Sequence, residues 1–237
     1  MIEKVNFFNR YHFNSKNYNL NINKTKKVFK KLLLDLKENR IPLLNSYEKN
    51  YKFSFSKKTV KKFSKYRNII IIGMGGSVLG SKSIYSFFKK KIRKKVFFFD
   101  NLDPNLNLKY NKIRNINNSC FVIISKSGDT LETIINLNSI FSKSLLKNKL
   151  IIITQLSNNV LMSVADKYGA EIIEHKKFMV GRYSVFSEPG MFPAALMGLN
   201  LNKFKKLKKL IKNKNFTSSL IQNVAGIYTL NLKAIRN

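Results

Sequence analysis

Residues 69–80 read IIIIGMGGSVLG, and residues 121–130 read FVIISKSGDT. In each stretch an apolar run ends in a loop of small, hydroxyl-bearing residues and leads into a helix-like segment. At such a strand-to-helix turn, unpaired backbone N–H groups and the helix dipole favour an anion. If the two strands are parallel neighbours, both turns lie at the same edge of one sheet. The sequence therefore predicts a site where one phosphorylated small molecule contacts both loops.

Apolar runs and helical patterns alternate through residues 67–190. We expect strands near 69–72, 96–99, 121–124, 150–154 and 171–173, and helices near 79–88, 130–142 and 160–168. Uninterrupted apolar strands separated by helices are typical of a parallel sheet that is covered on both faces. The expected fold class is therefore α/β, a doubly wound parallel sheet between helical extensions over residues 1–66 and 191–237.

The two extensions carry apolar residues at helical spacing among many lysines. The apolar positions are Val28, Phe29, Leu32, Leu33 and Leu36 in the first extension, and two stripes in the second, namely Phe204, Leu207, Leu210 and Ile211, then Leu220, Val224, Ile227 and Ile235. The dipeptide Ile41-Pro42 ends the first helical stretch. The two C-terminal stripes need a partner that covers them.

Two nucleotide-binding alternatives fail on the residues of the first loop. A dinucleotide fingerprint counted from Gly73 needs a glycine where this chain has Val78, because close helix packing there leaves no room for a side chain. Asp100, after the next strand, is better interpreted as the start of a turn than as a ribose ligand. No Gly-Lys-Ser/Thr follows the glycines, which excludes a P-loop. Ordinary tight turns remain the alternative for either loop alone.

A third stretch makes the interpretation specific. Residues 180–187 read VGRYSVFS, and residues 193–199 read PAALMGL. In this order and spacing, G-x-G-G-S-x-x-G, S-K-S-G-x-T-x-E-T, G-R-Y-S and P-A-A-L-x-G-L resemble the glucose-6-phosphate (phosphoglucose) isomerase family. The resemblance runs from about Ile41 to about Leu201 and implies a flavodoxin-like sugar isomerase (SIS) domain. It also implies reversible isomerisation of glucose 6-phosphate and fructose 6-phosphate through an enediol, in glycolysis and gluconeogenesis, with no cofactor or metal.

The resemblance assigns roles residue by residue. Substrate-binding positions are Gly76, Ser77, Ser125, Lys126, Ser127 and Thr130. Arg182, supported by Gly181, matches the catalytic arginine beside the reacting carbons, where a cation stabilises the charge of an enediolate. Glu132 matches a glutamate with a supporting role, and a first-turn carboxylate favoured by the helix dipole is an equal alternative. Val180 stands where the family has a glycine. A β-branched residue does not easily adopt positive φ, so if the family's loop needs positive φ at this position, the loop of this chain must have a different conformation.

The resemblance also implies catalytic groups that we do not expect in this sequence. Aldose–ketose isomerisation needs an acid–base group that reaches C1 and C2. In the family this base is a glutamate well downstream of G-R-Y-S, with a ring-opening histidine and a late lysine, and the chain ends at Asn237 before such segments. None of its 12 carboxylates matches the base, and we expect His12 and His175, which lack motif context, at the surface. We therefore expect this chain alone to bind hexose phosphate weakly and to turn it over little.

Composition bounds the remaining possibilities. Lys+Arg 45 against Asp+Glu 12 gives a net charge of +33, but the lysines are spread over nearly every segment with abundant Asn, Ile and Phe. We interpret this as the residue usage of an AT-rich genome and expect no specific nucleic-acid partner. The single cysteine, Cys120, excludes an internal disulfide and is expected in the core. No apolar run approaches the roughly 20 residues of a membrane span, so we expect a cytoplasmic protein with no membrane partner.

Two other functions stay open. A non-catalytic sugar-phosphate sensor could use the same loops, although no helix-turn-helix pattern stands in residues 1–66. Another phosphosugar isomerase would not normally combine G-R-Y-S with the Pro-Ala-Ala run. The resemblance further implies a homodimer when the full-length chain is present.

Overall fold

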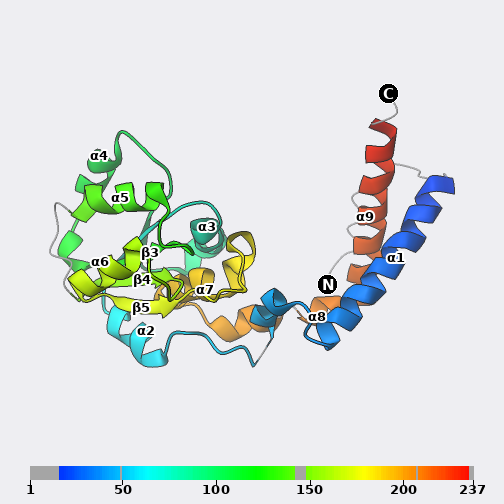
Figure 1. The fold of residues 1–237 in the computed structure, drawn as a ribbon, viewed down its shortest axis with the longest axis horizontal. Helices are drawn as coiled ribbons and strands as arrows, with labels where there is room; N and C mark the ends of the chain where they lie inside the picture. The colour runs from blue at the N-terminus through cyan, green and yellow to red at the C-terminus, as the bar shows by residue number, and fades with distance from the viewer. Residues whose placement is uncertain (1–15, 49, 142–147, 207, 235–237) are drawn as a thin grey trace. The chain divides into compact units, whose positions relative to one another are not determined.

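The computed structural model describes residues 16–48, 50–141, 148–206 and 208–234. The chain divides into two compact units, one of residues 50–204 and one that joins residues 1–49 to 205–237. The first unit contains the sheet and the second is helical (Figure 1).

The larger unit is built on a five-stranded parallel sheet. Its strands are β1 (Asn68–Gly73), β2 (Lys95–Phe99), β3 (Ser119–Ile124), β4 (Leu150–Thr154) and β5 (Glu171–Glu174). They lie in the order β2-β1-β3-β4-β5, with every neighbouring pair parallel. After β1 the chain adds β2 on one side of β1, and it then crosses back to add β3 on the other side. The direction in which strands are added therefore reverses between β1 and β3. In open α/β sheets, ligands bind at the carboxyl ends of the strands that flank such a reversal.

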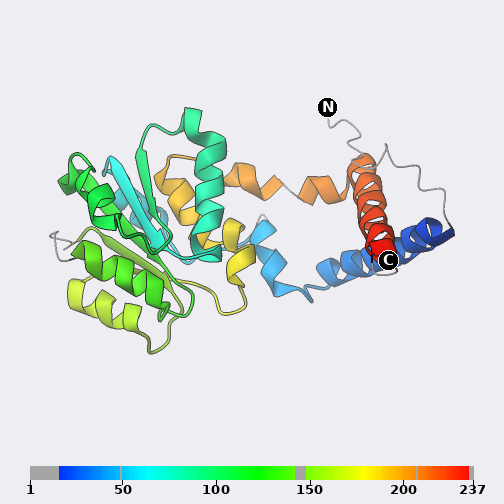
Figure 2. The same cartoon turned by 90° about the horizontal axis from the view of Figure 1, so that it is seen from above.

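Helices cover both faces of this sheet (Figure 2). They are α2 (Lys57–Ser64), α3 (Gly76–Phe88), α4 (Leu106–Asn111), α5 (Leu131–Phe141), α6 (Val160–Tyr168) and α7 (Glu188–Leu196), with short 3-10 turns η2 (Lys89–Lys91), η3 (Ile116–Asn118), η4 (Gly181–Phe186) and η5 (Leu201–Lys206). Successive side chains of a strand point to opposite faces. Ile70 and Ile72 therefore pack with α4, α5 and α6, whereas Ile69 and Ile71 pack with α2, α3 and α7.

The fold class predicted from the sequence is confirmed. Each expected strand is found within two residues of its predicted bounds. The strands β1, β3 and β4 are buried along their whole length and are therefore mostly apolar, whereas the edge strands β2 and β5 are partly exposed and begin with a charged residue. Cys120 is fully buried in β3, as expected, and burial raises the pKa of its thiol to about 12.

The helical unit pairs two long helices. Its elements are α1 (Lys16–Lys37), η1 (Pro42–Tyr47), α8 (Lys208–Ile211) and α9 (Lys214–Ala234). Helix α1 packs along α9, and the buried Asn21 donates from Nδ2 to Thr229 Oγ1 at 3.0 Å. The predicted stripe on α9 is only partly covered, since Leu220 is 39% and Ile227 51% exposed. Leu207 and Ile235, which belong to the predicted stripes, lie outside the described residues.

Candidate functional site

The first loop joins β1 to α3 at the carboxyl edge of the sheet. Gly75 has φ +52°, a backbone conformation that L side chains rarely adopt, and it precedes the first helical residue, Gly76. A Cβ atom at Gly76 would lie 2.5 Å from Gly181 C and 2.6 Å from Arg182 N. Only glycine fits this approach, so the G-R-Y-S segment packs directly on the start of α3. Ser77, in the first turn of α3, lies beside this contact.

The second loop joins β3 to α5 next to the first loop, since Gly73 pairs with Ile124 in the sheet. Ser125 Oγ lies 2.8 Å from Thr130 Oγ1 and accepts a hydrogen bond from Gly128 N–H at 3.2 Å. Ser127 is exposed at the tip of the loop, and its Oγ lies 3.4 Å from Thr130 Oγ1. The hydroxyls that the sequence predicts as phosphate ligands therefore lie close together, because they hydrogen-bond to one another and to the backbone of the loop.

The N-terminus of α6 fastens the second loop. Gly128 has φ +79°, and a Cβ atom there would lie 2.1 Å from Asn159 Oδ1, the oxygen that caps α6 by accepting from Met162 N–H. Asp129 Oδ1 accepts from Val160 N–H at 2.9 Å. The shape of the loop is therefore set by its own hydroxyls and by a second helix.

Lys126 connects the second loop to the stretch that carries Arg182. Its Nζ donates to Lys177 O at 2.9 Å, and its backbone carbonyl accepts from Gln155 N–H at 3.1 Å. The ammonium is thus held at the beginning of the chain segment between β5 and α7.

The third segment is the 3-10 turn η4. Ser184 is buried, and its Oγ donates to Gly181 O at 2.7 Å and lies 3.4 Å from Gly76 O. Arg182 is exposed, and its guanidinium makes no hydrogen bond or ion pair with any part of the chain that the structure describes. Val180 has φ −85° and ψ 138°, an extended conformation open to any residue. Replacing the family's glycine by valine therefore imposes no backbone strain.

Glu132 is partly exposed in the first turn of α5. Within the described ranges its carboxylate has no ion-pair partner, and its place at a helix N-terminus agrees with the helix-dipole alternative. Its supporting role stays a prediction. Over those same ranges no three His, Cys, Asp or Glu side chains gather as they would around a metal ion.

The expected surface position of His175 is wrong. His175 follows β5, is fully buried, and neither ring nitrogen has a hydrogen-bond partner in the described structure. Burial lowers the pKa of the imidazole to about 4, so the ring is neutral at pH 7. The sequence offered no motif around His175, and its neighbours Glu174, Lys176 and Lys177 give no local sign that the ring is buried. His12 lies outside the described residues.

Sequence reasoning also missed a buried charge. Glu188, the first residue of α7, is fully buried and accepts hydrogen bonds from Tyr51 and from the backbone of Ser54. These partners lie more than 130 positions away in the sequence. No local signal could have identified this contact.

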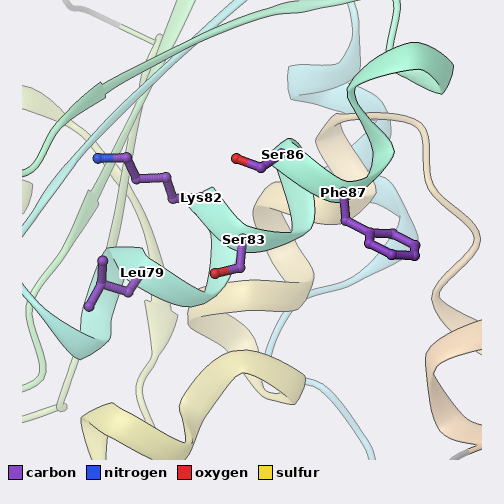
Figure 3. A pocket seen from close by; sticks show the side chains of 5 residues that line it. All are labelled: Leu79, Lys82, Ser83, Ser86 and Phe87. Carbon is purple, nitrogen blue, oxygen red and sulfur yellow. The ribbon is translucent and has the colours of Figure 1, made fainter.

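A shallow depression on the outer face of α3 includes none of the predicted site residues in its lining. Its lining consists of Leu79, Lys82, Ser83, Ser86 and Phe87 (Figure 3). The Nζ atom of Lys82 lies 2.5 Å from Asp100 Oδ2. The carboxylate that follows β2 therefore has an ion-pair partner within the protein and needs no ribose ligand to explain it.

Comparison with known proteins decides the family. The family model described as phosphoglucose isomerase matches residues 44–231, most of the chain. The chain belongs to the phosphoglucose isomerase family. Among curated isomerases of this family, glucose-6-phosphate isomerase of Methanocaldococcus jannaschii is 33% identical over 163 residues, which cover 65% of this chain and 40% of that protein. The enzyme of Borreliella afzelii is 32% identical over 174 residues, 68% of this chain and 32% of that protein.

Solved structures agree with the family on the fold. A hypothetical protein from Thermus thermophilus superimposes with a TM-score of 0.66 at 19% identity, over 92% of this chain and 54% of that one. A glucose-6-phosphate isomerase from Chlamydia trachomatis gives a TM-score of 0.57 at 20% identity, over 73% of this chain and 36% of that one. The chain spans roughly a third of the length of the curated relatives that it matches. None of the helices in the described ranges has the length and apolar character that crossing a membrane requires.

Proposed function

We propose that this chain forms the sugar-phosphate-binding part of a glucose-6-phosphate isomerase, which interconverts glucose 6-phosphate and fructose 6-phosphate through an enediol. The observation that carries the proposal is the meeting of all three motif segments at one edge of the sheet. Gly73 pairs with Ile124, and Gly76 touches the backbone of Gly181 and Arg182. One hexose phosphate could therefore contact both loops and the arginine.

In this proposal the substrate phosphate lies between the N-termini of α3 and α5. The N–H groups of a first helical turn lack intrahelical acceptors, and the helix dipole adds favourable potential for a dianion. The hydroxyls of Ser77, Ser125, Ser127 and Thr130 add donors that need no buried counter-charge. Lys126 adds a nearby positive charge.

The sugar end of the substrate then lies toward Arg182. When a base removes the proton next to the carbonyl, negative charge develops on the oxygens of C1 and C2. A guanidinium can donate two parallel hydrogen bonds to such a pair of oxygens, and it stabilises them most where water is excluded. Arg182 is exposed and makes no hydrogen bond or ion pair with the described residues, so its donors can turn to a ligand.

The proton transfer itself is assigned to no residue of this chain. We propose that the chain alone binds hexose phosphate weakly and turns it over little. For the whole enzyme we propose a homodimer that acts in the cytoplasm, in glycolysis and gluconeogenesis.

Calorimetric titration with hexose phosphates tests the proposal. We expect glucose 6-phosphate and fructose 6-phosphate to bind more tightly than an amino-sugar phosphate, and free fructose not to bind. Ser125→Ala should weaken binding of both hexose phosphates, because it removes a hydroxyl that organises the loop. Ser139→Ala, on the exposed part of α5, is the matched control. Equal affinity for phosphorylated and free sugars would contradict the proposal.

A further inference from the structure

Glu188 is a buried carboxylate whose partners come from separate stretches of the chain. Tyr51 Oη donates to its two oxygens at 3.0 and 3.1 Å, and Ser54 N–H donates to Oε1 at 3.0 Å. Lys176 Nζ lies 3.8 Å from Oε1. A buried charge is costly unless it is paired and hydrogen-bonded, and here both conditions are met. We call Glu188, Tyr51, Ser54 and Lys176 the Glu188 cluster.

Lys176 is itself fixed on three sides. Its Nζ donates to Lys52 O at 2.6 Å and lies 4.1 Å from the centre of the Tyr51 ring, in addition to its pairing with Glu188. Burial raises the pKa of Tyr51, and the negative charge of Glu188 and its hydrogen bond raise it further. The phenol therefore stays a hydrogen-bond donor throughout the physiological pH range.

The cluster closes the base of the segment that carries Arg182. Lys176 stands two residues after the end of β5, and Glu188 is the first residue of α7. Their ion pair joins the two ends of residues 177–187, and residues 51–54 bind to both partners. From the second loop, Lys126 adds a hydrogen bond to Lys177 O. The chain between these points is therefore held as a closed loop against the site.

We propose that the Glu188 cluster positions Arg182 for its contact with the sugar end of the substrate. The guanidinium of Arg182 has no hydrogen bond or ion pair within the described residues. The position of the Arg182 backbone therefore determines which positions the guanidinium can occupy. Ser184 and the close contact at Gly76 fix the tip of the loop, and the cluster fixes its base. Glu188 is thus a positioning residue that never touches substrate. The contact of Arg182 with the sugar end of the substrate rests on the proposed function.

Two probes separate the positioning of Arg182 from phosphate binding. A five-carbon sugar-acid phosphate carries a carboxylate that mimics the two enediolate oxygens, whereas inorganic phosphate engages only the two loops. For Glu188→Gln we expect the dissociation constant of the sugar-acid phosphate to rise about tenfold, within the usual span of coupling between sites, and that of phosphate to stay unchanged. In an Arg182→Ala background Glu188→Gln should add nothing, because the residue it positions is gone.

Glu171→Gln is the matched control. It breaks another lysine–carboxylate pair, Lys62–Glu171 at 2.8 Å, at the opposite end of β5. We expect this variant to leave both dissociation constants unchanged. Tyr51→Phe is a milder variant of the cluster, because it keeps the ring beside Lys176 and removes only the hydroxyl. Tyr51→Phe should also raise the dissociation constant of the sugar-acid phosphate, but by less than Glu188→Gln does.

Hydrogen exchange tests the cluster without any ligand. The amides of Tyr183 and Ser187 donate to Val180 O and Ser184 O within the loop, both at 2.9 Å. They should exchange faster in Glu188→Gln and Tyr51→Phe than in Glu171→Gln. Unchanged exchange in both cluster variants, or equal weakening of both probes, would overturn the inference. If the unmodified protein binds no sugar-acid phosphate, the proposed function fails, and amide exchange still decides whether the cluster holds the loop.

Discussion

At the scale of single residues, two glycines that face each other have opposite requirements. Gly76 has backbone atoms of Gly181 and Arg182 where a Cβ atom would lie, whereas a Cβ atom at Gly181 would meet nothing within 4 Å. Neither backbone position needs positive φ. The need for glycine at 76 therefore comes from the approach of the third segment, which the first loop's own sequence does not reveal.

We expect Gly76→Ala to destabilise the fold by about 1–3 kcal/mol, the usual cost of overpacking, and to weaken binding of a sugar-acid phosphate. Gly181→Ala should change stability by less than about 0.5 kcal/mol, because open space surrounds its Cβ position. Thermal and urea unfolding of the two variants measure the difference. Equal losses of stability would show that the close approach is not maintained in solution.

The buried His175 predicts a pH dependence of stability. Its pKa is about 4 in the folded protein against an ordinary value of 6.5, so between these values the unfolded chain binds more protons. Stability therefore falls as pH decreases from 6.5 to 4, by about 3 kcal/mol for this group in total. Urea unfolding of the protein and of His175→Leu at several pH values tests this. We expect the variant to have a shallower slope in that window, and parallel slopes would contradict the burial of a neutral ring.

At the scale of elements, the sequence predicted what depends on local pattern and missed what depends on contacts between distant segments. The strands and the two loops follow from apolar runs that end in glycine and serine, and the structure places them side by side. The segment around His175 reads as polar, yet the backbone N–H of His175 donates to Thr154 O and the ring is buried. The pairing of Glu188 with Tyr51 joins elements that no periodicity connects. On α9, the predicted stripe includes Ile227, which is exposed, while Ala225, Gly226 and Thr229 are buried.

The N-cap of α6 should contribute to phosphate binding because it also holds the second loop. Asn159→Ala is expected to cost about 1 kcal/mol of stability, as loss of a cap does, and to weaken binding of inorganic phosphate several-fold. Ser56→Ala removes the cap of α2, where Ser56 Oγ accepts from Thr59 N–H at 3.0 Å. It should cost similar stability and leave phosphate binding unchanged. Phosphate titrations of both variants decide whether the cap acts on the loop.

At the scale of the whole molecule, the charge of +33 acts on every anion. The Debye length is about 10 Å at 0.1 M salt, so the long-range part of this field is screened at moderate ionic strength. We expect the association constant of fructose 6-phosphate to fall several-fold between about 20 and 200 mM salt. Ser125→Ala should lower the affinity at every salt concentration without changing this slope, because it alters no charge. Affinity independent of salt would mean that the net charge has no part in binding.

The most direct test of the central claim is an amide NMR spectrum of the chain titrated with fructose 6-phosphate. We predict that the largest shift changes fall on residues 75–77, 125–130 and 181–184, which would place one ligand against all three segments. Changes confined to the depression on the outer face of α3, or spread evenly over exposed lysine-rich helices, would contradict the account.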